Sequence, residues 1–180
     1  MATLLLIACT SASQSSVSSP TARVDADATL GCDTANITSD RPRPKRGKRD
    51  VVIGPVHLVS IRRFGRYPKR HFRADEGGDY SGKVPLVLGS ETRLRLAVAR
   101  RSRSHASLTY ASRIRGKPRV RKGDSVLDFE ACDAVQSVWP GAILVDGPQC
   151  VPLHLYIDDA ERPEKLRVAF GRGTCKSKQN

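Results

Sequence analysis

The residues of this chain that could do chemistry include four histidines, and their spacing builds no familiar catalytic or metal site. His57, His71, His105 and His154 lie far apart, outside any HxH or HExxH pattern. The sequence also has no G-x-S-x-G segment, which would position a hydrolase serine, and no glycine-rich phosphate loop. We therefore expect no catalytic residue, no cofactor and no metal ion, and we expect His154 on the solvent face of a strand.

One acidic cluster follows an apolar segment. Asp158, Asp159 and Glu161 carry carboxylates of the kind that bind calcium, but a solvated turn after a strand is the simpler interpretation. A small hydrolase of the cell envelope would need a cleft in which polar side chains converge, and a sequence does not show clefts. An envelope hydrolase is therefore the third hypothesis for the function.

The four cysteines beyond the N-terminal region are even in number, as in disulfide-bonded proteins of oxidising compartments: Cys32, Cys132, Cys150 and Cys175. They allow three connectivities. The spacing favours Cys132–Cys150, between neighbouring strands, with Cys32–Cys175 joining the two ends of the domain. No pair has the C-x2-C spacing of a zinc site. The alternative is four reduced, buried thiols.

The segments that must position these residues alternate between apolar and polar side chains. A period of two is the signature of half-buried strands, because successive side chains point to opposite faces. The clear segments are 92–99, 125–131, 151–157 and 165–170, and the weaker ones are 51–61, 84–88, 107–111 and 141–145. No segment has a sustained helical stripe. We expect an all-β fold, a small antiparallel β-sandwich of about seven to nine strands.

Composition bounds the domain organisation. The chain has 180 residues, of which 39% are apolar, and this suits one modest domain with disordered flanks. It contains no apolar run of about 18 residues, which excludes a protein with several membrane-spanning helices. Residues 10–49 are rich in serine and then in basic residues, so we expect a disordered tether there, followed by the β-sandwich domain at 50–175 and a disordered tail at 176–180.

The N-terminal residues indicate where in the cell the protein is located. Residues 1–9 read MATLLLIAC, and the segment Leu6-Ile7-Ala8-Cys9 resembles the lipobox of bacterial lipoproteins. The resemblance implies that 1–9 is a shortened signal segment and that Cys9 carries a lipid. It therefore implies an extracytoplasmic protein, anchored to a membrane or secreted, with the serine-rich residues as its tether.

A second resemblance lies in the C-terminal third. The segments FEAC (129–132), GAILVDGPQCVPLHLYID (141–158) and RVAFGRGTC (167–175) are similar to secreted or lipid-anchored β-rich proteins of high-GC bacteria. The similarity covers about the last 50 residues well and VVIGPVHL (51–58) loosely. It implies an exported β-rich domain with paired cysteines, and it implies no particular activity.

The positive charge is concentrated in two stretches. The formal net charge is +13, and residues 41–70 hold eleven basic residues against one acidic residue. Residues 93–122 hold eleven basic residues and no acidic one. Such segregation predicts a basic face that attracts polyanions. The candidate polyanion-binding residues are Arg62, Arg63, Arg66, Lys69, Arg70, Arg100, Arg101, Arg103, Arg113 and Arg115.

The choice of polyanion depends on the compartment. For an exported protein it is an acidic envelope polymer or anionic lipid head groups, near which each basic residue contributes about 1 kcal/mol. The alternative function is nucleic-acid binding through 41–70 and 93–122, with Phe64, Tyr67 and Phe72 interleaved among the basic residues. A third reading is a solvated, arginine-rich surface with no ligand. We expect an exported envelope protein that acts as a binding or structural module.

Overall fold

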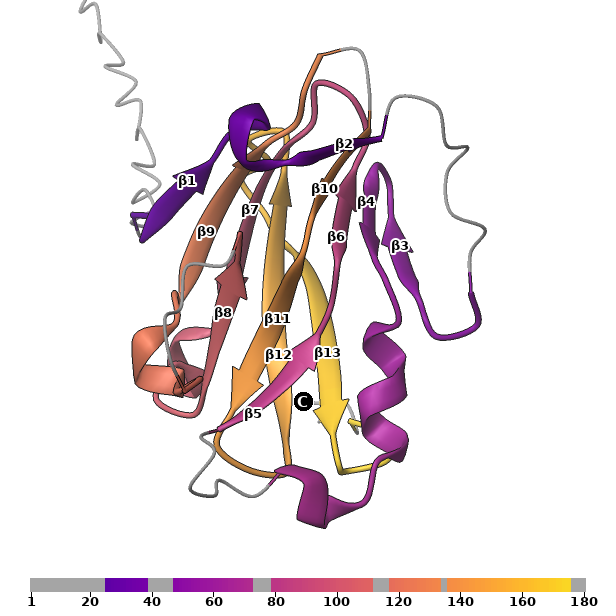
Figure 1. Ribbon diagram of the computed structural model, residues 1–180, viewed down its shortest axis with the longest axis vertical. Coiled ribbons are helices and arrows are strands. Elements are labelled where there is room, and N and C mark those ends of the chain that lie inside the picture. Colours follow the sequence, from indigo (N-terminus) through magenta and orange to yellow (C-terminus); the bar gives the residue numbers. More distant parts are fainter. Residues whose placement is uncertain (1–24, 39–46, 73–78, 112–116, 134–135, 176–180) are drawn as a thin grey trace, which may run out of the picture.

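The computed structural model describes residues 25–38, 47–72, 79–111, 117–133 and 136–175 (Figure 1). This part of the chain is all-β, with short 3-10 helices and no α-helix. The strands are β1 (Ala28–Leu30), β2 (Asn36–Thr38), β3 (Val51–Ile53), β4 (Val56–Leu58), β5 (Tyr80–Lys83), β6 (Leu86–Leu88), β7 (Arg93–Val98), β8 (Ala106–Tyr110), β9 (Val126–Glu130), β10 (Gln136–Trp139), β11 (Gly141–Val145), β12 (Gln149–Ile157) and β13 (Glu164–Phe170). The 3-10 helices are η1 (Cys32–Thr34), η2 (Ile61–Arg66), η3 (Lys69–Phe72), η4 (Arg100–Ser102) and η5 (Val120–Lys122).

The first layer is a five-stranded sheet with the order β1-β9-β7-β12-β13. Its pairs are antiparallel except for β1, which lies parallel to β9. The alternation expected from the sequence places Leu94, Leu96 and Val98 on the inner face, where each is buried. The residues between them, such as Arg95, point to the outer face. That outer face holds the candidate site.

The second layer consists of the sheets β2-β10-β6-β4-β3 and β5-β11-β8. Two short connections join these sheets. Strand β5 leads into β6 through Pro85, and β10 leads into β11 through Pro140. A proline has no backbone N–H to donate to a ladder, and at Pro85 and Pro140 the strand is interrupted. The hydrogen bond from the Val84 N–H to the Gly141 carbonyl, 2.8 Å, joins the two strand pairs at the bend.

The core between the layers contains two aromatic groups. In one, the ring of Phe129 makes edge contacts with Tyr110 and Trp139 at centroid distances of 5.2 and 5.3 Å. In the other, Phe64 of η2 stacks on Phe170 of β13 at 5.1 Å, and Phe72 of η3 contacts Phe170 edge-on. All of these side chains except Phe129, at 1%, are fully buried.

The all-β expectation is confirmed, although the strands are more numerous than the seven to nine expected. The segment 51–61 is not one strand but the hairpin β3–β4 followed by the first residue of η2. Gly54, with φ of 53°, sits in the left-handed region at the hairpin turn, which a glycine adopts without strain. The proline bends in the second layer divide two further strands. Strands β1, β2, β5 and β10 had no clear alternation and were not expected.

The domain begins before residue 50, so the expected tether at 10–49 is too long. Residues 28–30 and 36–38 form β1 and β2, which add to the edges of the two layers. The carboxylate of Asp27 accepts hydrogen bonds from the backbone N–H groups of Ser125 and Val126. A three-residue strand is too short for the alternation test, which explains why it was missed. Residues 1–24, including Cys9, and the tail at 176–180 lie outside the described residues.

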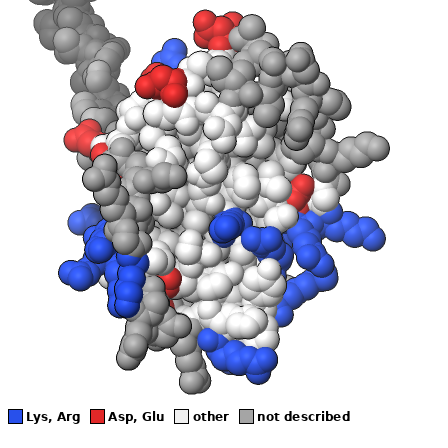
Figure 2. Space-filling view, viewed as in Figure 1, with Lys and Arg blue, Asp and Glu red and all other residues white. Residues whose placement is uncertain are grey.

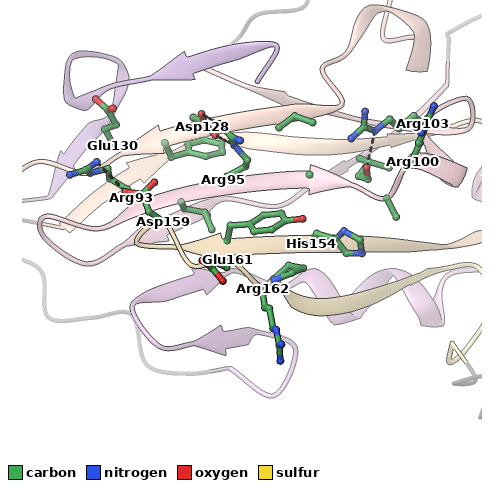
Figure 3. A pocket seen from close by; sticks show the side chains of 18 residues that line it. Arg93, Arg95, Arg100, Arg103, Asp128, Glu130, His154, Asp159, Glu161 and Arg162 are labelled. Atoms are coloured by element: carbon green, nitrogen blue, oxygen red, sulfur yellow. Dashed lines mark hydrogen bonds and ion pairs between the residues drawn. The ribbon is translucent and has the colours of Figure 1, made fainter. Parts of the chain in front are cut away.

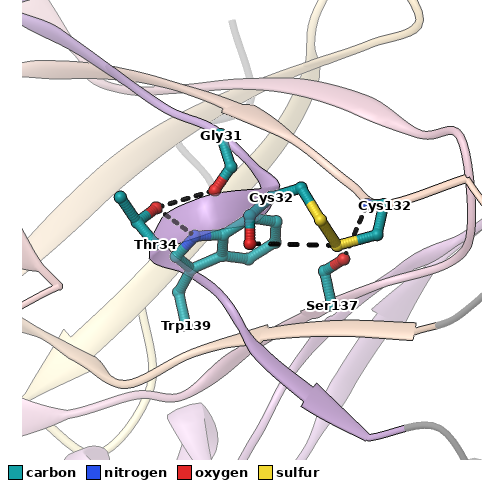
Figure 4. Close-up of a disulfide and its surroundings, with 6 residues drawn as sticks. All are labelled: Gly31, Cys32, Thr34, Cys132, Ser137 and Trp139. Atoms are coloured by element: carbon teal, nitrogen blue, oxygen red, sulfur yellow. Dashed lines mark hydrogen bonds between the residues drawn. A yellow bond between two sulfur atoms is a disulfide. The ribbon is translucent and has the colours of Figure 1, made fainter.

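The four cysteines are paired, in a connectivity different from the one favoured by spacing. Cys32 bonds to Cys132 and Cys150 bonds to Cys175, with Cα–Cα distances of 5.0 and 5.7 Å. The favoured pairs Cys132–Cys150 and Cys32–Cys175 are therefore wrong. The physical reason is that η1 passes directly over the end of β9 (Figure 4), whereas the turn after β13 returns to the start of β12. The number of residues between two cysteines does not show where the chain crosses itself in this way.

Candidate functional site

A groove of about 500 Å³ lies along the outer face of the first sheet (Figure 3). Its floor is made by outward-facing residues of three adjacent strands: Asp128 of β9, Arg95 and Ala97 of β7, and His154 and Tyr156 of β12. The ladder pairs Arg95 with both Asp128 and Tyr156, and it pairs Ala97 with His154. The alternation that buries the inner face therefore gathers these polar side chains in the groove.

An arginine–carboxylate pair occupies the middle of the groove. Arg95 Nε and Nη2 each donate a 2.8 Å hydrogen bond to a different oxygen of Asp128, so the pair is bidentate. Both side chains are 26% exposed. The hydrogen bond to Asp128 raises the pKa of Arg95 against the opposing effect of burial. The two charges compensate each other, so the middle of the groove is close to neutral.

One end of the groove is basic. Figure 3 shows Arg100 and Arg103 together there, with His154 on the adjacent strand. Arg103 is half-buried, and its Nε donates a hydrogen bond of 3.1 Å to the carbonyl oxygen of Val98. Neither arginine has an ion-pair partner in the part of the chain that the structure describes. This end therefore carries positive charge that no carboxylate compensates.

The positive charge at this end affects the pKa of His154. Burial is the main cause that lowers the pKa of His154, and the nearby cations Lys165, Arg101 and Arg103 lower it further. An imidazole surrounded in this way is neutral at pH 7 and resists protonation. A bound anion would reverse the electrostatic contribution and favour the imidazolium. His154 thus lies on the outer face of its strand, as expected, and it lies within the groove.

The opposite end of the groove mixes both charges. Arg93 forms an exposed ion pair of 3.2 Å with Asp159, and Glu130, Glu161 and Arg162 complete the lining. Asp158 Oδ1 accepts a hydrogen bond of 3.0 Å from the Arg93 backbone N–H. The acidic cluster seen in the sequence is thus a turn attached to β7. Across the described ranges, no group of three or more His, Cys, Asp or Glu side chains could hold a metal ion.

Arg101 follows Arg100 in η4, and five other candidate polyanion residues lie on another flank of the molecule. Arg62, Arg63 and Arg66 belong to η2, and Lys69 and Arg70 belong to η3, at the lower right and bottom of Figure 1. Helix η5, in orange, lies at the lower left. Figure 2 shows basic side chains at the lower left of this face, from its middle to its right flank, and at its lower edge. Arg113 and Arg115 lie outside the described residues. The two basic stretches therefore do not merge into one face.

The aromatic residues interleaved with the first basic stretch are part of the core. Phe64 and Phe72 are fully buried, and Tyr67 contacts both of them at centroid distances of 6.0 and 6.3 Å. Nucleic-acid-binding surfaces that stack bases need exposed ring faces. Phe64 and Phe72 cannot serve in that way, because their rings contact Phe170 and Tyr80 instead.

The other histidines lie away from the groove. His57 is buried and its Nε2 lies 3.0 Å from Asp50 Oδ2, while His105 Nδ1 lies 2.7 Å from Asp146 Oδ2. His71 lies on η3 and is exposed. Hydrogen bonds from the Ser60 and Gly47 backbones and from His57 outweigh burial and hold the pKa of Asp50 below its usual value. The His57–Asp50 pair fixes the start of β3 beside η2.

The sequence located one end of the groove and missed its middle. Arg100, Arg101 and Arg103 were candidates because they lie in a basic stretch. Arg95, Asp128 and Tyr156 were not, although each stands at an outward position of a segment with period two. A polar residue at an outward strand position is ordinary. The missing information was the order β9-β7-β12, which places the three side chains next to one another.

No protein-family model matches the chain, and neither a curated protein nor a solved structure matches it. Function must therefore be argued from the groove itself. Among the described residues, no helix has the length and apolar character needed to cross a membrane.

Proposed function

We propose that this protein is an extracytoplasmic binding module that holds part of an anionic polymer in the groove on the outer face of its first sheet. The observation that carries the proposal is the pair of arginines at one end, Arg100 and Arg103. Both line the groove and lack a carboxylate partner among the described residues, and Arg103 is one of the cations that lower the pKa of His154. Cations without partners in a groove favour an anionic ligand over a neutral one.

The shape of the groove favours an extended ligand. It follows the strands from the level of Arg93 and Glu130 to Arg100, beyond the end of β7. A strand rises by about 3.3 Å per residue, so the groove is roughly 20 Å long. An extended chain could place an anionic group at the basic end and hydroxyl or amino groups against the compensated pair and the mixed-charge end. A lone small anion would leave most of the groove empty.

The location is part of the proposal. Two disulfides suit an oxidising compartment, because cytosolic thiols are kept reduced. The lipobox-like segment ending at Cys9 adds a lipid anchor, with the serine-rich stretch as the spacer between membrane and domain. The natural ligand would then be an acidic polymer of the envelope, or anionic lipid head groups on a neighbouring membrane.

A binding assay tests the function. The purified chain is titrated with inorganic polyphosphate, with poly-glutamate and with vesicles containing anionic phospholipid. The double variant Arg100→Gln/Arg103→Gln removes the uncompensated charge. The matched control, Arg62→Gln/Arg66→Gln, removes the same charge from η2. Each cation contributes about 1 kcal/mol, so the groove variant should bind polyphosphate about thirtyfold more weakly.

The control decides whether the groove is responsible. Near-wild-type affinity of the η2 variant, together with the loss in the groove variant, supports the proposal. Equal losses in both variants would show binding by diffuse charge and would overturn it. Tighter binding to duplex DNA than to polyphosphate at the same salt concentration would favour the nucleic-acid alternative.

A further inference from the structure

We infer that the bond between Arg49 and Asp50 is a processing site for a subtilisin-like endoprotease specific for paired basic residues. We also infer that cleavage there gives a two-chain protein held together by the disulfide Cys32–Cys132. The inference does not depend on what the groove binds. It shares with the proposed function only a location outside the cytoplasm, where such a protease would meet the folded chain.

The basic pair Lys48–Arg49 is accessible. Both side chains are exposed, in a turn that precedes β3, and neither has an ion-pair partner in the part of the chain that the structure describes. Proteases of this class recognise two consecutive cations through acidic subsites and cleave after the second. Exposed turns are preferred sites of cleavage in folded proteins.

The other basic pairs of the described chain are less suitable. Arg62–Arg63, Lys69–Arg70, Arg100–Arg101 and Arg121–Lys122 all lie within 3-10 helices. A protease binds its substrate in an extended conformation, so each of these helices would have to unwind. Helix η2 is also attached to the end of β13, because the carbonyls of Phe64 and Gly65 accept hydrogen bonds from Gly171 and Gly173.

Three hydrogen bonds hold the turn at Lys48–Arg49. The Asp50 N–H donates to the Gly47 carbonyl, the Asp50 carboxylate accepts from the Gly47 N–H, and the Arg49 carbonyl accepts from the Arg62 N–H. The Asp50 carboxylate also accepts a hydrogen bond of 2.7 Å from the Ser60 N–H and lies 3.0 Å from His57 Nε2, so the opening must release this side chain as well. It does not require any strand of the first sheet to separate. Cleavage of the folded protein therefore follows the population of a local opening, not global unfolding. Replacing the Asp50 carboxylate with an amide, as in Asp50→Asn, should weaken its hydrogen bonds and increase the population of the opened turn.

The piece before the cut would stay in place. It contributes β1 to the first sheet and β2 to the second layer, and Thr34 Oγ1 accepts a hydrogen bond of 3.1 Å from the Trp139 indole (Figure 4). Cys32 links it covalently to Cys132. Since the expected lipidation residue Cys9 also belongs to this piece, cleavage alone would leave the domain anchored. Reduction of the disulfide after cleavage would allow its release.

Limited digestion of the purified, oxidised chain with a subtilisin-like endoprotease specific for paired basic residues tests the inference. We expect the first cut to give fragments 1–49 and 50–180, seen by intact mass, which migrate together until the disulfides are reduced. Arg49→Gln should abolish this cut, whereas the matched control Arg101→Gln should leave its rate unchanged. Asp50→Asn should accelerate it, with the thermal midpoint of each variant measured in parallel.

Three results would overturn the inference. The first is an initial cut at any of the other basic pairs. The second is unchanged cleavage of Arg49→Gln at this bond. The third is separation of the two fragments without reductant. Because polyphosphate binding is measured independently on the uncleaved chain, a negative digestion result leaves the proposed function standing.

Discussion

The indole Nε1 of Trp139 donates a hydrogen bond of 3.1 Å to Oγ1 of Thr34, a residue 105 positions earlier in the chain. The same hydroxyl donates to the Gly31 carbonyl at 2.8 Å, so Thr34 connects the core to the first segment of the domain. Nearby, Cys32 bonds to Cys132, whose backbone N–H donates to the buried hydroxyl of Ser137. The N-terminal segment is therefore an integral part of the sandwich.

The two disulfides should differ in their contribution to stability. In the loop-entropy model, removing Cys32–Cys132, which encloses 100 residues, costs about 4 to 5 kcal/mol, and removing Cys150–Cys175, with 25 residues, costs about 3 to 4 kcal/mol. The variants Cys32→Ala/Cys132→Ala and Cys150→Ala/Cys175→Ala are compared by urea denaturation. An unchanged free energy of unfolding in the first variant would contradict the role given to the N-terminal segment.

Gly141 cannot carry a side chain. A Cβ at this position would collide with the ring of Tyr110, which is fully buried. Gly141→Ala should therefore displace the ring and cost about 3 kcal/mol or more, as overpacking does at its upper range. The control is Gly54→Ala, where the added methyl meets open space and only the left-handed φ opposes it, at about 1 kcal/mol. Thermal unfolding measures both, and equal losses would contradict this packing.

Tyr110 should be the last tyrosine to ionise. Burial raises the pKa of Tyr110 well above its usual value, and the hydroxyl donates a 3.0 Å hydrogen bond to the Val84 carbonyl. Ultraviolet absorbance during alkaline titration should show one tyrosine that ionises only when the fold opens. Tyr110→Phe should remove that late phase and cost about 1 kcal/mol, because the Val84 carbonyl loses its partner. A late phase that persists in this variant would contradict the assignment.

Stability should fall on mild acidification because of His154. Its pKa is lower in the folded protein than the ordinary value of 6.5, so below that pH the unfolded chain binds a proton that the folded chain resists. The contribution is fully present above about pH 6.5 and is lost as the pH falls toward the folded pKa. His154→Gln should flatten this part of the profile, and His71→Gln serves as the control. An unaltered slope in His154→Gln would refute the assignment.

The sequence predicted every strand of the first sheet except β1, and it did not predict the order in which these strands pair. Segments 92–99, 151–157 and 165–170 alternate clearly because one face of each strand is buried and the other faces solvent. They correspond to β7, β12 and β13. Strands β1 and β2 are too short for such a pattern, and their stability comes from partners about 100 residues away. The sequences of β1 and β2 alone do not indicate which strands they pair with.

The site was predictable only where charge accumulates along the chain. Arg100 and Arg103 belong to a visible basic stretch, but their separation from η2 is a property of the tertiary structure. Arg95 and Asp128 lie 33 positions apart, and only the pairing of β7 with β9 brings them together. The same limitation explains the disulfides, because correct pairing required knowing which turns pass over which strand ends.

The claim that an anionic polymer binds beside His154 is tested most directly by an NMR titration of the four histidines, with and without saturating polyphosphate. The account predicts that polyphosphate raises the pKa of His154, because a bound phosphate offsets the charges of Lys165, Arg101 and Arg103. His57 and His71 do not line the groove, so polyphosphate should leave the chemical shifts of their imidazole protons unchanged at a fixed pH. Saturable binding of polyphosphate with no change at His154 would contradict the account.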